Sequence, residues 1–279
     1  MSTMFDSLKR LSYRPEVLKP IQKLGLSSVL RRAYFQVAKP RNGILETEVA
    51  GTRARFYART PEELRILESA GGAGGEERVL SELVRFLKPG DAVLDIGANV
   101  GLYTVLLASN VGDHGLVIAC EPCARNYNHL VENLILNGLA NVRLFRKALG
   151  NTSGQAKLYA STVIGNSSLS GEGNGNAGAE DVEVIEGDRL IISEMLPVPR
   201  AVKIDVEGFE YAVLEGLQAT LKSPRCQLVA CEVHPSLLPA GIEPGAIAEL
   251  LQGCGFTRIQ DHLRWDKTFH VIATKGGQE

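Results

Sequence analysis

The chain has 279 residues, of which 44% are hydrophobic and 22% are charged, and its formal net charge at pH 7 is −2. This is enough apolar material for one large domain, or for a core domain with an extension. The near-neutral charge balance lacks the basic footprint that nucleic-acid binding leaves, so we do not expect a nucleic acid as partner.

Localisation signals are missing from the sequence. No apolar run reaches the roughly 18 residues that a membrane-spanning helix needs, and the N-terminus shows no apolar core followed by a cleavage site. The five cysteines are odd in number and scattered, which favours reduced thiols. We therefore expect a cytoplasmic protein and leave homo-oligomerisation open. Cys120 and Cys123 form a C-x-x-C pair with no second pair to complete a zinc site, so a redox or zinc role is the lesser alternative.

Residues 1–60 are predicted to form an N-terminal extension. The first forty are basic, with leucines at loosely helical spacing, and this pattern predicts one or two helices packed on the core domain. A peripheral membrane contact or a docking segment for a partner is the alternative. Residues 44–58 alternate between apolar and polar around a glycine turn, which predicts a hairpin.

Residues 61–279 are predicted to form an α/β domain. A helix is expected from Glu76 to Lys88, where Pro89-Gly90 ends it. Strand-like runs follow at 92–97, 115–121, 142–149, 201–207, 226–234, 256–263 and 269–275, with helical stretches such as 124–137 and 209–221 between most of them. This alternation predicts a mostly parallel sheet covered on both faces, with the last two strands as an antiparallel hairpin at one edge.

The stretch 150–187 breaks this rhythm. Two short strand-like runs flank a tract rich in Gly, Asn and Ser at 164–181. Such a composition cannot pack a core, so we expect a flexible loop close enough to the sheet to act as a lid.

Acidic residues and a glycine turn follow the first two strands of the predicted sheet. Asp95 precedes the turn that contains Gly97 and Gly101, and the middle glycine of a dinucleotide fingerprint is missing. Glu121 ends the next strand, where an acid commonly binds ribose hydroxyls. This combination suits a nucleoside with a positively charged tail, so S-adenosylmethionine (SAM) fits better than NAD. A purely structural turn with a solvated Glu121 is the alternative.

Several motifs in order resemble the FkbM family of SAM-dependent methyltransferases. They are DIGANVGLYT, CEPCARNYNHLVENLILNG, KIDVEGFEYAVLEG and CEVHP, and the resemblance covers roughly residues 55–275. It implies a class I methyltransferase (Rossmann-like) fold with a seven-stranded, mostly parallel sheet, and methyl transfer to an oxygen. The family usually has an apolar residue before the acid and Asn or a small residue after the proline, so Cys120 and Cys123 depart from its pattern.

The resemblance also assigns residues to the SAM site. The SAM loop would consist of Asp95, Gly97, Asn99 and Gly101, with Glu121 as the ribose acid. Asn133 and Asn137 match asparagines that recur in the helix after that acid, and Ala148 lies where the family places the adenine ring.

Four ionisable residues end two further strands. Asp205 and Glu207 end one, and Glu232 and His234 end the next, so the four are expected to converge beside the transferred methyl. An alcohol acceptor must lose a proton, and we expect His234 to be the general base, oriented by Glu232 or Glu207.

Two other interpretations of these four residues stay open. They could hold a divalent cation such as Mg²⁺, or they could form a strand-end salt-bridge cluster with Lys203 or Arg225. The other histidines, at 114, 129, 262 and 270, are interpreted as incidental.

The sequence therefore predicts a SAM-dependent O-methyltransferase that acts on a hydroxyl of a sugar, glycan or secondary metabolite. The alternatives are a non-catalytic SAM-binding or scaffold protein and an NAD-dependent oxidoreductase. The acceptor itself lies beyond the sequence, because specificity in such sheets is set by loops and flanking helices.

Overall fold

The computed structural model describes residues 27–73, 76–160, 167–168, 179–264 and 268–276. Seven strands form the central sheet: β3 (Ala92–Ile96), β4 (Leu116–Cys120), β5 (Val142–Phe145), β10 (Ala201–Ile204), β11 (Leu228–Val233), β12 (Arg258–Leu263) and β13 (Phe269–Thr274). Their order is β12-β13-β11-β10-β3-β4-β5. The five strands from β11 to β5 are parallel, and β13 pairs antiparallel with both β11 and β12. The predicted class I methyltransferase sheet and its antiparallel hairpin are confirmed.

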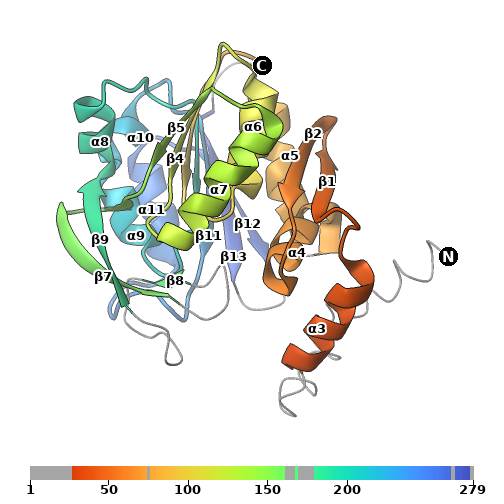
Figure 1. Ribbon diagram of the computed structural model, residues 1–279. Helices are drawn as coiled ribbons and strands as arrows, with labels where there is room; N and C mark the ends of the chain where they lie inside the picture. Colours follow the sequence, from red (N-terminus) through yellow and green to blue (C-terminus); the bar gives the residue numbers. More distant parts are fainter. Residues whose placement is uncertain (1–26, 74–75, 161–166, 169–178, 265–267, 277–279) are drawn as a thin grey trace.

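Helices cover both faces of this sheet (Figure 1). One face carries α5 (Glu76–Phe86), α6 (Leu102–Val111) and α7 (Ala124–Asn137). The other carries α8 (Gly187–Ser193), α9 (Glu210–Glu215), α10 (Gln218–Lys222) and α11 (Gly245–Gly253). Because side chains alternate along a strand, Val93 packs into the first core and Leu94 into the second. The strands are therefore apolar on both faces, and their polar residues gather at the strand ends.

Two predicted elements are divided in the structure. The run 142–149 is not one strand: β5 ends at Phe145, and β6 (Ala148–Gly150) joins a separate four-stranded sheet. That sheet also contains β7 (Gly154–Ala160), β8 (Ser167–Ser168) and β9 (Ala179–Glu186). The stretch 209–221 forms α9 and α10 with Gly216 between them, and a Cβ at Gly216 would lie 1.9 Å from the Gly150 carbonyl oxygen. The close contact between Gly216 and β6 therefore determines where the predicted helix is interrupted. Most of the predicted loop 164–181 lies outside the described residues.

The N-terminal part begins with α3 (Ser27–Ala38) and continues with β1 (Ile44–Val49), β2 (Thr52–Tyr57), α4 (Pro61–Glu68) and a π-helical turn, η1 (Ser69–Ala73). The predicted hairpin is confirmed by the antiparallel pairing of β1 and β2. Asn137 on α7 bonds both the backbone N–H and the backbone carbonyl of Arg55, and so acts like a neighbouring strand at the edge of β2. The domain boundary at residue 60 stays a prediction.

Within the described part of the chain, the helices are all too short or too polar to cross a bilayer. The basic segment before residue 27 lies outside the described residues, so its predicted role in docking or membrane contact is not tested. The expected cytoplasmic location stays a prediction as well.

Candidate active site

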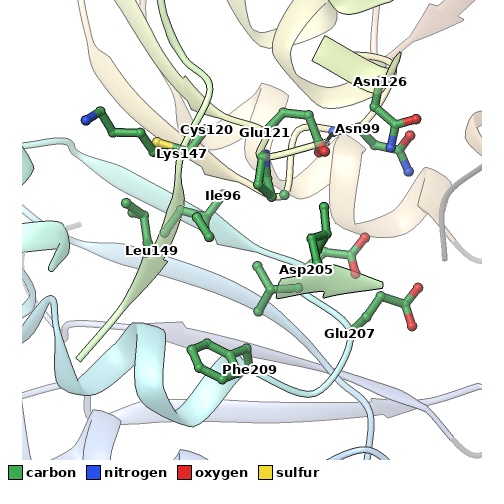
Figure 2. Close-up of a pocket in the computed structure, with 15 residues that line it drawn as sticks. Ile96, Asn99, Cys120, Glu121, Asn126, Lys147, Leu149, Asp205, Glu207 and Phe209 are labelled. Atoms are coloured by element: carbon green, nitrogen blue, oxygen red, sulfur yellow. Dashed lines mark hydrogen bonds between the residues drawn. The ribbon is translucent and has the colours of Figure 1, made fainter. Parts of the chain in front are cut away.

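An open pocket lies at the carboxyl ends of β3, β4 and β10, where ligands bind in sheets of this kind (Figure 2). It contains about 600 Å³ of empty space, part of which is open to solvent. It is lined by Ile96, Gly97, Asn99, Cys120, Glu121, Pro122, Asn126, Lys147, Ala148, Leu149, Leu158, Asp205, Val206, Glu207 and Phe209. The structure therefore brings together Gly97, Asn99, Glu121 and Ala148 from the predicted SAM set with Asp205 and Glu207 from the predicted chemical set.

The polar part of the pocket lining, here called the polar wall, includes Asn99, Glu121 and Asn126, and Glu121 is held in place by two backbone hydrogen bonds. One of its carboxylate oxygens accepts the Asn99 N–H at 2.8 Å and the other accepts the Cys123 N–H at 2.9 Å. Burial raises the pKa of Glu121 to about 7, although these two backbone hydrogen bonds oppose the shift. Each oxygen keeps lone pairs for further donors, as an acid that binds ribose hydroxyls requires.

Two asparagines in the pocket have unsatisfied acceptors. The Oδ1 atoms of Asn99 and Asn126 are buried and have no hydrogen-bond partner among the described residues. A buried acceptor without a donor is costly, and a ligand with hydroxyl and amine donors would remove that cost. An adenosyl group carries both kinds of donor, so the residues present fit SAM. The sequence did not single out Asn126, because an asparagine in the first turn of a helix is common without a ligand.

The two predicted loop glycines are required by close packing. Gly97 has φ +75°, and a Cβ on it would lie 1.8 Å from the Asp205 carbonyl oxygen. Gly101 has φ +92°, and a Cβ there would lie 2.2 Å from a methyl carbon of Leu130 on α7. Gly101 thus permits the close approach of α7 to the loop after β3.

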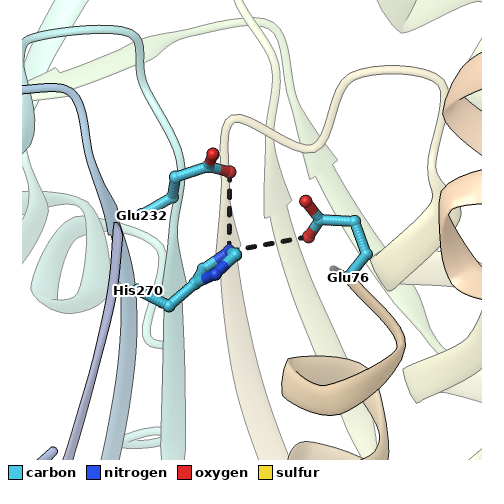
Figure 3. Close-up of side chains that lie close together, drawn as sticks. All are labelled: Glu76, Glu232 and His270. Atoms are coloured by element: carbon cyan, nitrogen blue, oxygen red, sulfur yellow. Dashed lines mark ion pairs between the residues drawn. The ribbon is translucent and has the colours of Figure 1, made fainter. Parts of the chain in front are cut away.

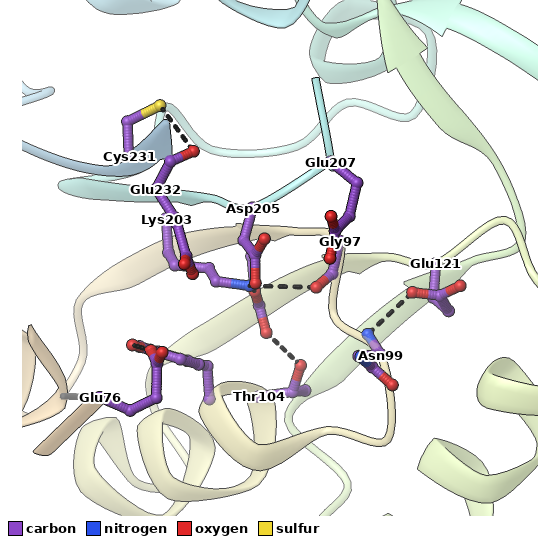
Figure 4. Close-up of polar contacts among 12 residues, drawn as sticks. Glu76, Gly97, Asn99, Thr104, Glu121, Lys203, Asp205, Glu207, Cys231 and Glu232 are labelled. Carbon is purple, nitrogen blue, oxygen red and sulfur yellow. Dashed lines mark hydrogen bonds and ion pairs between the residues drawn. The ribbon is translucent and has the colours of Figure 1, made fainter. Parts of the chain in front are cut away.

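Asp95 lies beneath the pocket, and it is not among the lining residues. Its carboxylate accepts the Thr104 hydroxyl at 2.5 Å and lies 3.3 Å from the Lys203 ammonium. Lys203 donates to the Gly97 carbonyl at 3.0 Å and lies 3.8 Å from Asp205 (Figure 4). Asp95 and Lys203 therefore fix the glycine turn from below.

Asn133 is also outside the pocket lining. Its amide nitrogen donates to the Val100 carbonyl at 2.8 Å, and its oxygen accepts the Tyr57 N–H at 2.9 Å. It therefore joins the loop after β3 to the N-terminal hairpin. Because both ends of its side-chain amide bond to the backbone, Asn133 is not placed to contact the cofactor.

The pocket-side cluster, defined as Asp205, Glu207, Glu210 and His234, lies next to this turn. Ligand atoms of Asp205, Glu207 and His234 lie within 4.8 Å of one another. The His234 Nε2 atom is 3.6 Å from Glu207, and its Nδ1 atom is 2.7 Å from Glu210. The sequence analysis expected Glu232 or Glu207 to orient the ring, but Glu210 makes the hydrogen bond. No sequence signal distinguishes Glu210 from an ordinary acid in the first turn of a helix.

The charges in the pocket-side cluster shift one another. Burial lowers the pKa of His234, but the hydrogen bond to Glu210 and the charges of Asp205 and Glu207 outweigh it and raise this pKa to about 10. Burial raises the pKa of Glu207 to about 7, against the attraction of His234. Burial and the charge of Glu232 raise the pKa of Asp205 to about 6. At neutral pH His234 is therefore protonated, and Glu207 titrates near the working pH.

Glu232 mainly belongs to a second group, the outer cluster, defined as Glu76, Glu232, Arg264 and His270. The His270 ring lies between Glu76 and Glu232, at 3.7 and 3.6 Å (Figure 3). Arg264 donates to Glu76 at 2.5 Å and to Glu232 at 2.7 Å. His270, interpreted as incidental from the sequence, is thus a buried ion-pair partner. Glu232 is 3.9 Å from the His234 Nε2 atom, so the two clusters adjoin.

The remaining histidine and cysteine predictions can be placed as well. His129 contacts Glu63 at 3.2 Å and ties α7 to the start of α4. All five cysteines are buried free thiols, and no candidate metal group among the described residues contains one. Two salt-bridge partners were considered for the four strand-end residues, and one of them, Lys203, lies 3.8 Å from Asp205.

In comparisons with known proteins, the chain matches the model of a methyltransferase family and is similar to two methyltransferases. Residues 95–258, more than half of the chain, match the family described as "Methyltransferase FkbM domain". The hexuronic acid methyltransferase AglP of Haloferax volcanii is 28% identical over 80% of this chain and 86% of its own length. The 31-O-demethyl-FK506 methyltransferase FkbM of Streptomyces tacrolimicus is 26% identical over 68% of this chain and 82% of its own.

Solved structures resemble the chain more distantly. An rRNA methylase from Streptococcus thermophilus has a TM-score of 0.46 and 15% sequence identity, over 71% of this chain and 95% of its own. That similarity is too low to carry an inference.

Proposed function

Because the chain belongs to the methyltransferase FkbM family and is a SAM-dependent methyltransferase, we propose that its acceptor is a hydroxyl of a sugar or of a secondary metabolite. The names of the two relatives supply these two acceptor classes. The observation that carries the choice of a hydroxyl is a pocket-lining carboxyl, Glu207, whose pKa is raised to about 7. A hydroxyl needs such a base, whereas a carboxylate acceptor does not.

The cofactor would be held by the polar wall of the pocket. Glu121 would accept the ribose hydroxyls, and the Oδ1 atoms of Asn99 and Asn126 would accept the remaining donors of the adenosyl group. Ala148 and Phe209 line the pocket with apolar surface suited to the adenine ring. When bound, SAM supplies a methyl group that is already activated as part of a sulfonium.

The base assignment moves from His234 to Glu207. A histidine with a pKa of about 10 carries its proton at neutral pH, so it is a poor proton acceptor there. Glu207 lines the pocket and would accept the hydroxyl proton as the carbon–oxygen bond forms. His234 would stabilise the ionised form of Glu207 from 3.6 Å, and Asp205, also in the lining, would orient the acceptor.

We propose this step without a metal ion. The alternative, in which Asp205, Glu207, Glu232 and His234 share a divalent cation, is weakened by the position of Glu232, whose carboxylate bonds Arg264 and Thr268. The His234 Nδ1 atom is also engaged by Glu210. Turnover is expected to be unchanged after treatment with a chelator, and a loss that Mg²⁺ restores would support the cation.

The acceptor class is tested by the chemistry of the product. Labelled SAM would be incubated with hexuronic acid glycosides, neutral sugars and polyhydroxylated metabolites. A methyl ether formed at a hydroxyl survives mild alkali, whereas a methyl ester formed at a carboxylate releases labelled methanol. We expect alkali-stable label, and alkali-labile label alone would contradict the hydroxyl assignment.

The two functional alternatives drawn from the sequence receive no support. An NAD-dependent oxidoreductase would need the missing middle glycine, and the family is one of methyltransferases. A scaffold that only binds SAM would not need the pocket-side cluster.

A further inference from the structure

We propose that Glu210 is a positioning residue that holds the turn 205–209 and the His234 ring in one fixed arrangement. The proposal deepens the proposed function and rests on it, because the two groups it joins flank the site of proton transfer. Glu210 begins α9, and its side chain is completely buried. It does not line the pocket, so it acts through its neighbours.

A single oxygen of Glu210 makes both contacts. Oε1 accepts the Gly208 N–H at 2.9 Å and the His234 Nδ1–H at 2.7 Å. The first contact fixes the backbone that carries Glu207, and the second fixes a ring at the end of β11. Charge-assisted hydrogen bonds of this kind are among the strong ones, and burial removes competing water.

The turn needs such a restraint because its backbone is strained. Glu207 has φ +52°, which is uncommon for a residue other than glycine, and Gly208 has φ +100°. A Cβ at Gly208 would lie 2.5 Å from the Leu237 carbonyl oxygen, so the turn packs tightly against the segment after β11. The hydrogen bond from the Gly208 N–H to Glu210 compensates part of this strain and sets the direction of the Glu207 side chain.

The same carboxylate decides which ring nitrogen faces Glu207. With Nδ1–H directed at Glu210, Nε2 is left 3.6 Å from Glu207. The other charged groups around the ring are Asp205, after β10, and Glu232, on β11 and 3.9 Å away. Lys203 lies beyond Asp205, at 3.8 Å from it. Among the described acids around the ring, Glu210 is the one within hydrogen-bonding distance.

The variant Glu210→Gln separates positioning from bulk structure. Glutamine keeps the size of the side chain and an acceptor for the Gly208 N–H, but it removes the negative charge. The pKa of His234, followed by NMR of its ring protons, is expected to fall by about one unit or more. The kcat is expected to fall about 100-fold with the KM for SAM unchanged, as for a small misplacement of reacting groups.

Two further variants complete the test. Glu215→Gln removes a half-buried carboxylate on the same helix, one that accepts a hydrogen bond from Asn151, and should change neither quantity. Glu210→Asp keeps the charge but shortens the side chain, and it is expected to lower kcat without uncoupling the histidine from a carboxylate. If the pKa of His234 and the kcat match the wild type in Glu210→Gln, or the kcat is unchanged in Glu210→Asp, the proposal is overturned.

The failure of this proposal is distinguishable from the failure of the proposed function. The NMR titration needs no acceptor, so it reports on the contact between Glu210 and His234 even if the wild type methylates none of the compounds offered. A shifted pKa in Glu210→Gln without methylation of any hydroxyl would keep the positioning role and contradict the proposed acceptor.

Discussion

The pocket-side cluster and the outer cluster are built from the same residue types but have opposite electrostatics. In the outer cluster, Arg264 lies 2.5 and 2.7 Å from two carboxylates. Burial raises the pKa of Glu76, but His270 and Arg264 outweigh it and lower that pKa to about 2. In the pocket-side cluster the cation beside Glu207 is His234, at 3.6 Å, and burial outweighs its attraction and raises the pKa of Glu207 to about 7. An arginine within hydrogen-bonding distance of both carboxylates makes a cluster structural, whereas a more distant cation beside a pocket leaves a carboxyl able to exchange a proton.

The largest effect should come from removing the proton acceptor of the pocket-side cluster. Glu207→Gln keeps the shape of the side chain, and kcat is expected to fall by about 10²- to 10⁴-fold, the usual contribution of a general base. Calorimetry should find the Kd for SAM little changed. The matched substitution in the outer cluster, Glu76→Gln, should cost far less in kcat, and an equal loss in both would remove the distinction between the clusters.

The outer cluster should instead respond in stability. Arg264→Met keeps the aliphatic stem but leaves the two largely buried carboxylates of the outer cluster, Glu76 and Glu232, with His270 as the cation that they share. The free energy of unfolding is expected to fall by about 3 kcal/mol, measured by denaturant titration. Arg258→Met, at an exposed position on β12, is the control and should change little. A stability within error of the wild type for Arg264→Met would contradict the structural role.

The residue proposed to bind the ribose, Glu121, should show a smaller effect on SAM affinity when it is substituted. Glu121→Gln retains one acceptor but turns the other carboxylate oxygen into a donor that faces a backbone N–H. The affinity for SAM is expected to fall about tenfold, corresponding to about 1.4 kcal/mol. Calorimetry on Asp95→Asn, whose residue lies beneath the pocket, provides the comparison. If Asp95→Asn weakened SAM binding more than Glu121→Gln did, the assignment of Glu121 as the main cofactor-binding residue would be contradicted.

The last effect is a pH dependence of stability. Burial lowers the pKa of His270, but the carboxylates of Glu232 and Glu76, 3.6 and 3.7 Å from its Nε2 atom, outweigh it and raise this pKa to about 9. A raised histidine pKa stabilises the fold fully below about pH 6.5, and this contribution is lost as the pH rises through about 9. His270→Asn should therefore show a flatter decline in unfolding free energy between these pH values. His114→Asn, in an exposed turn, should keep the wild-type slope.

The sequence predicted the seven strands of the main sheet because each is a short apolar run that ends in a turn signal. It failed where a contact between distant segments decides the local structure. Gly150 and Gly216 meet across two elements, and that contact divides the predicted helix 209–221. Pattern along the chain carries no information about such an approach.

The candidate site shows the same limit. Asp205, Glu207 and Glu121 could be found because they follow strands at a common edge of the sheet. Glu210 and the outer cluster could not, since their partners are set by packing: Arg264 and Glu76 are separated by 188 positions. The protonation of His234 likewise follows from three acids that only the fold assembles.

The pH dependence of the single-turnover rate tests most directly whether Glu207 is the proton acceptor. The measurement would use saturating SAM and an acceptor that the labelling experiment above has identified as a substrate. It would be made in the wild type, in Glu207→Gln and in His234→Asn. The wild-type rate should rise through an apparent pKa near 7, the value to which burial raises Glu207. This rise should vanish in Glu207→Gln and persist, at a lower rate, in His234→Asn. A rise that survives in Glu207→Gln and vanishes in His234→Asn would return the base to His234 and contradict the account.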